Sequence, residues 1–252
     1  MSKKLDIRIK TPQEMATLRE AGKVLARIVT QIKSSLKIGM TTKDIDLMAE
    51  ELISSEGVVA AFKGYRGYPS CVCVSVNEEI VHGIPGGRVI NSGDIVSVDI
   101  GIIRQEFFSD MAFSVGFGDL DAGRQKLLDV TRQALIKGIA QAKSGARLGD
   151  VSHAIQAYVE AKGFSVVRDF VGHGIGRKLH EDPDIPNFGH PGTGVVLKPG
   201  MVLAIEPMVN MGTYRTKTLQ DGWTVVTADR QPSAHFEHTI AVTEDGPVIF
   251  TE

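Results

Sequence analysis

Two aspartates stand at the ends of the stretch DIGIIRQEFFSD, residues 99–110, in a part of the chain that otherwise reads as strand. Apolar side chains alternate with small or polar ones on both sides of Arg104 and Gln105, as in two half-buried strands joined by a turn. A hairpin centred between these two residues would place Asp99 directly opposite Asp110. Like charges in that position repel by about 3 kcal/mol at an effective dielectric constant of about 20.

A divalent cation is the simplest way to offset this repulsion, because two carboxylates form a clamp of hard oxygen ligands. The alternative is that each aspartate lies at a solvated strand edge or anchors a turn. Arg-Gln is not a favoured two-residue turn, although a longer loop of even length about the same centre keeps the pairing. The hairpin therefore predicts a metal site that other residues of the chain must complete.

The helices that would position these strands occur twice. Helical periodicity covers residues 12–36 and 43–57, and it returns over residues 121–145 and 149–163. Three pairs of residues are 106 positions apart in the two sets: Gly39 and Gly145, Asp44 and Asp150, and Gly57 and Gly163. We predict that the two aspartates are N-caps, and that Gly57 and Gly163 follow the helix ends.

Strands that carry acids follow each helix pair. GDIVSVD at residues 93–99 matches GMVLAIE at residues 200–206, and a second acid-bearing strand begins at Asp110 and again at Glu237. The pattern predicts an α+β fold with strands inside and helices outside. We expect one domain, residues 1–252, with an internal repeat over roughly 11–118 and 119–252.

Two such halves facing one another would bring four carboxylates together, from Asp99, Asp110, Glu206 and Glu237. Two divalent cations would balance their charge. The segment GHGIGRKLHEDP adds His173, with glycines on both sides that would let the backbone approach whatever the imidazole binds. Oxygen-rich coordination with one imidazole suits Mn, Fe, Co or Zn, although a histidine in such a motif is often only a packed loop residue.

Two metal ions a few ångströms apart can share a water, lower its pKa and stabilise both ends of a hydrolytic transition state. Glu206 precedes Pro207, so its strand should end there. The Pro- and Gly-rich residues 181–194 predict a loop.

Composition excludes several other classes of protein. The chain has 252 residues, 42% of them hydrophobic and 23% charged, with a formal net charge of −2. Its sequence pI is about 6.4, which favours neither nucleic acid nor an anionic membrane as a partner. No signal peptide and no membrane span is expected. The two cysteines, Cys71 and Cys73, should share a strand face as reduced thiols in a cytoplasmic protein.

Five motifs together resemble the methionine aminopeptidase family, in family order and from about Lys10 to Phe250. They are VHGIP, DIGII…SDMAFSVG, GHGIGRKLHEDP, IEPMVN and FEHTIAVTEDGP. The resemblance implies the pita-bread fold and removal of the N-terminal methionine from nascent chains whose second residue is small. Only 31 positions separate Glu206 from Glu237, without a helical insert, and this is similar to the short type I bacterial form.

The resemblance also implies the residues that act. The two metal ions would bind to Asp99, Asp110, His173, Glu206 and Glu237. His180 would polarise the scissile carbonyl, His82 would assist at the amide nitrogen, and Glu206 would relay a proton from the water to the departing amine. A monovalent cation is implied near three residues: Asn77, Glu79 and Ser233.

The methionine pocket carries over less completely. Four of its residues match the family: Tyr65, Tyr68, Cys73 and Trp223. Phe62 stands where many bacterial relatives have cysteine, and Leu179 stands where many have phenylalanine. Gly101 replaces a common threonine beside Asp99. These changes should reshape the pocket and leave every metal ligand in place.

The family implies nascent polypeptide N-termini as substrates, transient ribosome association and a monomer in the cytoplasm, without a role for nucleic acid or membrane. One alternative is a proline-specific aminopeptidase or prolidase of the same fold, which would carry a large N-terminal domain. The other is a pita-bread binding protein without catalysis, which would have lost metal ligands. The chain starts almost at its first helix and keeps all five ligands, which favours the peptidase.

Overall fold

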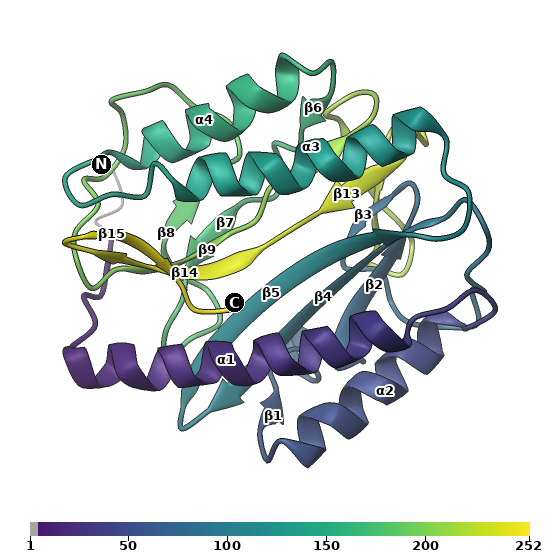
Figure 1. The fold of residues 1–252 in the computed structure, drawn as a ribbon, viewed down its shortest axis with the longest axis horizontal. Helices are drawn as coiled ribbons and strands as arrows, with labels where there is room; N and C mark the ends of the chain where they lie inside the picture. The colour runs from purple at the N-terminus through teal and green to yellow at the C-terminus, as the bar shows by residue number, and fades with distance from the viewer. Residues whose placement is uncertain (1–4) are drawn as a thin grey trace.

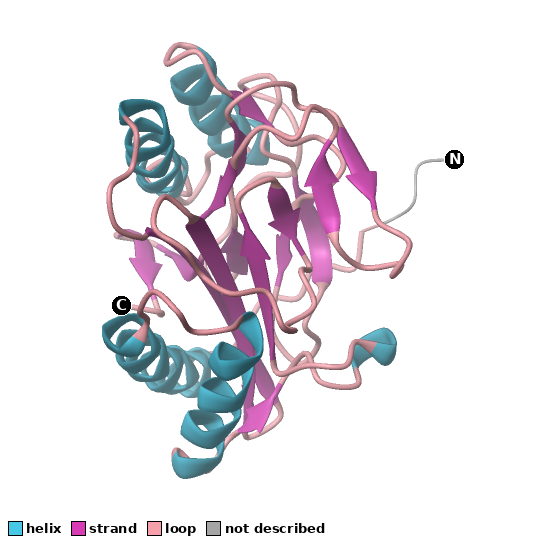
Figure 2. Ribbon diagram, turned by 90° about the vertical axis from the view of Figure 1, so that its right-hand side faces the viewer, coloured by secondary structure: helices cyan, strands magenta, loops and turns pink. Residues whose placement is uncertain are grey.

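Two pairs of helices lie on one side of the strands, and they dominate the face of the molecule seen in Figure 1. The computed structural model describes residues 5–252. The helices are α1 (Pro12–Ser35), α2 (Thr42–Ser55), α3 (Ala122–Ile139) and α4 (Leu148–Glu160). Figure 2 shows both pairs on the same side, at the left of the view, with the strands to their right. The predicted α+β class is confirmed.

The strands form two larger sheets, and each larger sheet supplies part of the site. The first comprises β1 (Val59–Ala60), β2 (Val72–Val76), β4 (Ile95–Arg104) and β5 (Phe107–Gly116). The second has the order β15-β14-β9-β7-β8, with bounds Gly246–Ile249, His238–Thr243, Val202–Ile205, Gly172–Gly174 and Glu181–Ile185.

Two smaller sheets connect them, and the pairing throughout is antiparallel. One smaller sheet contains β13 (Ser233–His235), β10 (Met208–Asn210) and β6 (Ser165–Val166). The other contains β11 (Thr216–Thr218), β12 (Val225–Thr227) and β3 (Glu79–Val81), and a short 3-10 turn, η1, covers Tyr65–Gly67. The segment between Glu206 and Glu237 therefore holds strands and turns without a helix, as predicted.

The hairpin of β4 and β5 turns at Gln105 and Glu106, one residue later than predicted. Both turn residues have left-handed backbones, with φ of 48° and 67°, which matches the twist that a two-residue hairpin turn requires. Asp99 therefore lies opposite Ala112, and Asp110 opposite Gly101. The predicted direct pairing of the two aspartates is wrong, but they keep a common face because the register differs by two residues.

The helix starts differ from the prediction in one detail. Thr41 is the N-cap of α2, and Asp44 is the third helical residue, whose carboxylate accepts a hydrogen bond from the Thr41 N–H at 2.7 Å. At the start of α4, the Asp150 carboxylate likewise accepts a hydrogen bond from the Arg147 N–H at 2.8 Å. The predicted N-cap role of these aspartates is wrong, because an acid at the third position reaches back to the cap.

The glycines at matching places have matching backbones. Gly57 and Gly163 follow the ends of α2 and α4 with φ of 67° and 85°, as predicted. Gly39 and Gly145 have φ of 91° and 83°. The left-handed conformation explains why glycine stands at all four positions.

Each helix pair packs on its own strands. Val98 and Ile100 of β4 lie in a buried cluster with Leu25 and Ile28 of α1. A second cluster joins α3 and α4 to the second larger sheet. Side chains alternate between the two faces of a sheet along each strand. The side chains of Asp99 and Asp110 therefore lie on the face of the first sheet that is opposite Val98, Ile100 and α1.

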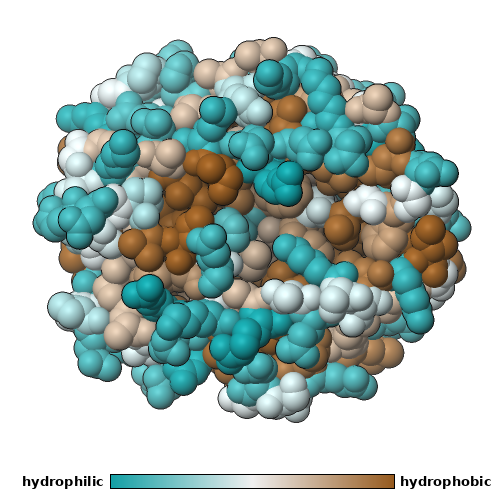
Figure 3. Space-filling model, viewed as in Figure 1, coloured by the Kyte–Doolittle hydropathy of each residue, from teal (hydrophilic) through white to brown (hydrophobic). Residues whose placement is uncertain are grey.

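The predicted loop at 181–194 begins as a strand, β8, which carries Pro183. Proline is tolerated there because β8 is the edge strand of its sheet. No helix within residues 5–252 combines the length and hydropathy needed to cross a membrane. The helical face is largely hydrophilic, with hydrophobic residues gathered where α3 ends near β15 (Figure 3).

Candidate active site

Five potential metal ligands line one cavity of about 280 Å³. Asp99 and Asp110 come from β4 and β5, and His173 comes from β7. Glu206 follows β9, which ends at Ile205 as predicted, and Glu237 directly precedes β14. The structure thus brings together all five residues that the sequence predicted.

The two halves of the chain are joined at this point. The Glu237 N–H donates to the carbonyl of Ala112 at 2.9 Å. The Asp110 N–H donates to the Thr239 hydroxyl at 3.0 Å, and that hydroxyl donates back to the Asp110 carbonyl at 2.8 Å. These bonds fix β5 against β14, so the carboxylates of Asp110 and Glu237 face the same space from different halves.

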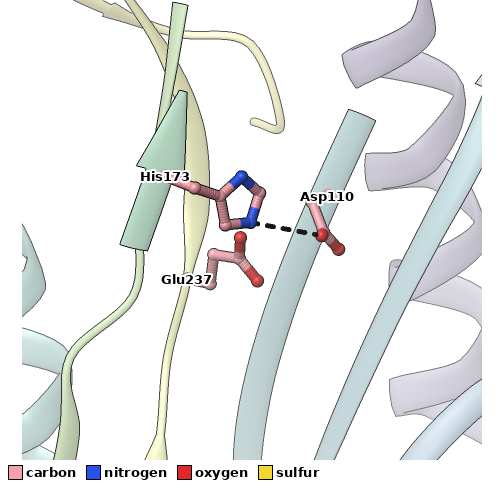
Figure 4. Close-up of side chains that lie close together, drawn as sticks. All are labelled: Asp110, His173 and Glu237. Carbon is pink, nitrogen blue, oxygen red and sulfur yellow. Dashed lines mark ion pairs between the residues drawn. The ribbon is translucent and has the colours of Figure 1, made fainter. Parts of the chain in front are cut away.

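The ligand atoms of Asp110, His173 and Glu237 lie within 4.8 Å of one another. Figure 4 shows the three side chains pointing toward a common space. His173 Nε2 is 3.9 Å from Asp110 Oδ2 and 3.7 Å from Glu206 Oε1. A divalent ion bound by oxygen and imidazole needs ligands that converge on this scale. The donor set therefore fits a metal centre.

Two buried carboxylate oxygens support this interpretation. Asp99 Oδ1 and Glu237 Oε1 have no hydrogen-bond partner among the described residues. An ionised carboxylate in such surroundings is costly unless a cation or a donor compensates it. A metal ion would satisfy both oxygens at once, so the residues present fit the group.

The four carboxyl groups have raised pKa values. Burial raises the pKa of Asp110 to about 7, against a hydrogen bond from the Met111 N–H that lowers it. Burial also raises the pKa of Asp99, Glu206 and Glu237 well above the usual range, and the neighbouring carboxylates add to the shift. Such a cluster resists ionisation by itself and becomes ionised when cations compensate the charge.

His173 is prepared to act as a neutral ligand. Its Nδ1 lies 3.0 Å from the carbonyl of Gly174, which can only accept, so Nδ1 carries the hydrogen. Nε2 is then left with its lone pair toward Asp110 and Glu206. Burial lowers the pKa of His173 to about 4, so the ring is neutral at pH 7.

The glycines beside His173 have a different role from the one predicted. A Cβ at Gly172 would lie 2.4 Å from the Ala204 carbonyl oxygen, and one at Gly174 would lie 2.3 Å from that of Asp182. The absent side chains therefore make room for neighbouring backbone and not for a ligand. The prediction of backbone approach to a bound group is wrong for these two positions.

A buried ion pair anchors the segment that runs from His173 to Glu181. Lys10 Nζ lies 2.7 Å from Glu181 Oε2, with side-chain exposures of 6% and 5%. A Cβ at Gly176 would meet both side chains at 2.7 Å. The Gly176 carbonyl also accepts a hydrogen bond from the Phe108 N–H at 2.8 Å. These contacts fix the segment that carries His180.

His180 faces the same cavity as His173, with their ring centroids 4.3 Å apart. Its Nδ1 is 2.9 Å from the Tyr65 hydroxyl. Partial burial against the cavity wall lowers the pKa of His180, with further contributions from His173 and Arg66. The ring is therefore neutral at pH 7 and carries a single N–H.

His82 lies on another wall of the cavity. It has a left-handed backbone, with φ of 60°, and its ring meets Phe170 edge-on with centroids 5.5 Å apart. The Trp223 ring lies 6.3 Å away on a second side. Burial lowers the pKa of His82, so it too stays neutral at pH 7.

The predicted methionine pocket forms the apolar wall of the cavity. All its predicted residues line it: Phe62, Tyr65, Tyr68, Cys73, Leu179 and Trp223. Tyr68 and Trp223 meet edge-on with centroids 5.1 Å apart. Both cysteines are free and buried, but Cys71 packs in the cluster beneath α1 and α2, so the two thiols do not share a face as predicted.

Sequence reasoning missed three residues. Arg66 and Phe170 line the cavity, and His235 places Nε2 3.3 Å from Glu206 Oε2. Arg66 lies between the two predicted pocket tyrosines, which was an available signal. His235 is two residues before Glu237 on an extended segment, a spacing that places two side chains on one face.

The residues predicted for a monovalent cation lie near one another. The Ser233 N–H donates to the Asn77 carbonyl at 2.8 Å. The Glu79 carboxylate accepts from the Val76 N–H at 2.8 Å and from Arg88 at 2.7 Å. Asn77 has a left-handed backbone, with φ of 57°. The cation itself stays a prediction.

Comparison with known proteins agrees with this geometry. The sequence profile described as metallopeptidase family M24 matches residues 16–244. Methionine aminopeptidase 1 of Bacillus subtilis is 53% identical over 96% of this chain and 98% of its own. Methionine aminopeptidase of Clostridium perfringens is 51% identical over the same shares. The crystal structure of methionine aminopeptidase from Thermotoga maritima superposes with a TM-score of 0.96 at 51% identity, covering 98% of this chain and 99% of that one.

Proposed function

The chain belongs to the methionine aminopeptidases of metallopeptidase family M24, with the pita-bread fold, and from this premise we propose that the cavity described above is its active site. The protein is a hydrolase that removes the initiator methionine from nascent proteins and peptides with a small second residue. One observation carries the site assignment: two buried and two half-buried carboxylates converge with one neutral imidazole beside an apolar pocket.

We assign two divalent ions to Asp99, Asp110, His173, Glu206 and Glu237, with Co, Mn, Fe and Zn as candidates. When bound, the ions supply Lewis acidity and an activated water for attack on the peptide bond. The unpartnered oxygens of Asp99 and Glu237 support this assignment. Glu206, with one carboxylate oxygen toward His173, is the group that takes a proton from the water and passes it to the departing amine.

The contact between the Tyr65 hydroxyl and Nδ1 of His180 determines which ring nitrogen of His180 carries the hydrogen. If the Tyr65 hydroxyl donates to Nδ1 of the neutral ring, the single N–H of His180 is at Nε2. That N–H can donate to the scissile carbonyl oxygen and to the oxyanion that develops from it. His82, also neutral, assists at the amide nitrogen.

The pocket explains the preference for methionine. Phe62, Leu179 and Trp223 offer an apolar slot for an unbranched thioether, in which lysine would leave an unpaired charge. Discrimination against leucine should be weaker, because pockets resolve a methylene-scale difference by only about 10–200-fold.

A peptide panel tests the function: Met-Ala-Ser, Met-Gly-Ser, Met-Arg-Ser, Leu-Ala-Ser, Lys-Ala-Ser and an X-Pro peptide. We expect fast release of methionine from Met-Ala and Met-Gly, and little hydrolysis of Met-Arg, Lys-Ala or X-Pro. Equal rates across the panel would mean a general aminopeptidase, and cleavage of X-Pro alone would indicate a prolidase.

We also propose that the protein acts in the cytoplasm as a monomer, with transient association with the ribosome. Its single domain would consist of two related halves, roughly residues 11–118 and 119–252. The matching backbones of Gly39 and Gly145 and the matching acids of α2 and α4 support the repeat.

A further inference from the structure

His235 is a buried histidine with no role in the proposed function. Only 1% of it is exposed, and its Nε2 lies 3.3 Å from Glu206 Oε2. The distance suits a hydrogen bond, yet Nε2 has no aligned hydrogen-bond partner within residues 5–252. An unpaired nitrogen at this depth is costly, so a polar atom 3.3 Å from a proposed metal ligand calls for a function.

The two oxygens of Glu206 face different imidazoles. Oε1 lies 3.7 Å from Nε2 of His173, and Oε2 lies 3.3 Å from Nε2 of His235. The carboxylate is therefore placed between a proposed metal ligand and a second ring. A group that fixes Oε2 also fixes the direction of Oε1, because the carboxylate is planar.

The backbone of His235 is held from the other half of the molecule. The Ser114 hydroxyl of β5 donates to the His235 carbonyl at 2.8 Å and accepts from the His235 N–H at 2.9 Å. Met208 of β10 is its partner in the sheet. These contacts keep the ring beside Glu206.

We propose that His235 is a positioning residue whose Nε2–H donates to Glu206 Oε2, and thereby directs Oε1 toward the metal ions. This inference rests on the proposed function, because it takes Glu206 as a metal ligand. A metal-bound carboxylate is ionised and can only accept, so the ring must carry its hydrogen at Nε2. Partners of this kind typically change metal affinity or activity by about 10–100-fold when they are removed.

Two substitutions of His235 test this role, because glutamine and asparagine carry the same amide N–H donor on side chains of different length. Glutamine at 235 can place an N–H donor near the position of Nε2, whereas asparagine is shorter by one C–C bond, about 1.5 Å. Metal-stripped wild type, His235→Gln and His235→Asn would be titrated with Co²⁺ by calorimetry and by visible absorption. We expect His235→Asn to weaken Co²⁺ binding about 10–100-fold with an altered spectrum, and His235→Gln to stay close to wild type.

His238→Asn is the matched control, because His238 hydrogen-bonds to the Thr251 hydroxyl at 2.8 Å instead of facing Glu206. Circular dichroism would confirm that each variant is folded before titration. Wild-type Co²⁺ affinity in His235→Asn, or an equal loss in His235→Gln, would overturn the positioning role. Wild-type protein that bound no stoichiometric Co²⁺ would instead refute the proposed function, and the positioning role with it.

Discussion

At the scale of single residues, Gly101 and Phe62 lie against each other beside Asp110. A Cβ at Gly101 would lie 2.8 Å from Phe62 Cε1, 3.0 Å from Ala61 Cβ and 3.3 Å from Asp110 Oδ1. The Phe62 ring thus fills space that a side chain at position 101 would need. The large ring at Phe62 and the absent side chain at Gly101 therefore compensate each other beside Asp110.

Gly101→Ala should therefore destabilise the protein by about 1–3 kcal/mol through overpacking. In a Phe62→Ala background the same change should cost much less, because the ring that it meets is gone. Urea unfolding of the wild type, both single variants and the double variant would measure this coupling. Free energies that add within about 0.3–0.5 kcal/mol would contradict the compensation.

His180→Ala should lower turnover far more than it weakens metal binding. Its proposed task is to donate to the developing oxyanion, and loss of one such donor typically costs about 10²–10³ in rate. Steady-state kinetics and metal content per chain would be measured together. His173→Ala is the comparison and should lose metal. Metal loss in His180→Ala would show that the roles of the two histidines are assigned wrongly.

Residue types and spacing predicted the four acids and His173, because carboxylates in apolar strands are conspicuous, whereas the family resemblance implied His82, His180 and the methionine pocket. His235 had one signal, its place two residues before Glu237, but in AHFEHT it differs from a packed core histidine only through its neighbours in space. Arg66 was marked by its place between Tyr65 and Tyr68, whereas nothing in the sequence marks Phe170. The close approach of Phe62 to Gly101 also needed coordinates, because 39 positions separate the two residues.

At the scale of elements, the sequence predicted which sheet face each side chain occupies, but it did not predict which residues of β4 and β5 pair with one another. Alternation in β4 and β5 fixed which side chains point inward, and a shift of two residues leaves that unchanged. The turn itself has Gln105 and Glu106, which carry none of the usual Asn-Gly signal. The predicted helix starts were also shifted. Asp44 and Asp150 lie three residues after their N-caps, and each carboxylate accepts a hydrogen bond from the N-cap N–H.

Replacing the turn by Asn-Gly, with Gln105→Asn and Glu106→Gly, should stabilise the protein. Left-handed backbones cost ordinary residues about 1–2 kcal/mol each, and both turn residues have positive φ. The change also removes an ion pair between Glu106 and Arg177 at 2.9 Å, but Glu106 is 83% exposed there and such pairs contribute little.

Thermal unfolding would measure this effect, with an expected rise of about 2–4 °C per kcal/mol gained. Glu106→Gln is the control, because it removes the charge and keeps the backbone requirement. A melting temperature of the Asn-Gly variant at or below that of Glu106→Gln would contradict the argument from backbone strain.

At the scale of the whole molecule, two halves bring four carboxylates into one buried space, and this makes stability depend on pH. Burial raises the pKa of Asp110 to about 7 and those of Asp99, Glu206 and Glu237 well above their usual range. Unfolded carboxyl groups ionise near pH 4, so the folded state holds more protons above that pH. Its stability therefore falls as pH rises.

The buried histidines act in the opposite direction, but only at lower pH. The pKa values of His173 and His235 are lowered by burial, so unfolding takes up protons around and below the unfolded value of about 6.5. At pH 6.5 the unfolded histidines are still half protonated, so their effect fades by about pH 7.5 and the carboxyl effect dominates above that pH. We expect the free energy of unfolding of metal-free protein to decrease from about pH 7.5 to pH 8.5, and added metal to oppose this decrease.

Asp110→Asn should make that decrease shallower and raise the melting temperature of metal-free protein at pH 8, because one buried carboxyl group no longer ionises. Asp129→Asn, at an aspartate with a side chain 53% exposed, is the control and should follow the wild type. A slope that is identical in Asp110→Asn and wild type would refute the electrostatic account of the cluster.

The central claim is that carboxylates from both halves hold the metal ions on which methionine release depends. The most direct test adds a candidate ion stepwise to metal-stripped protein and follows methionine release from Met-Ala-Ser together with bound metal per chain. We predict no release without metal, a rise to a plateau at two bound ions, and no release by folded Asp110→Asn at any ratio. Full activity of the stripped protein, or of Asp110→Asn with normal metal content, would contradict the account.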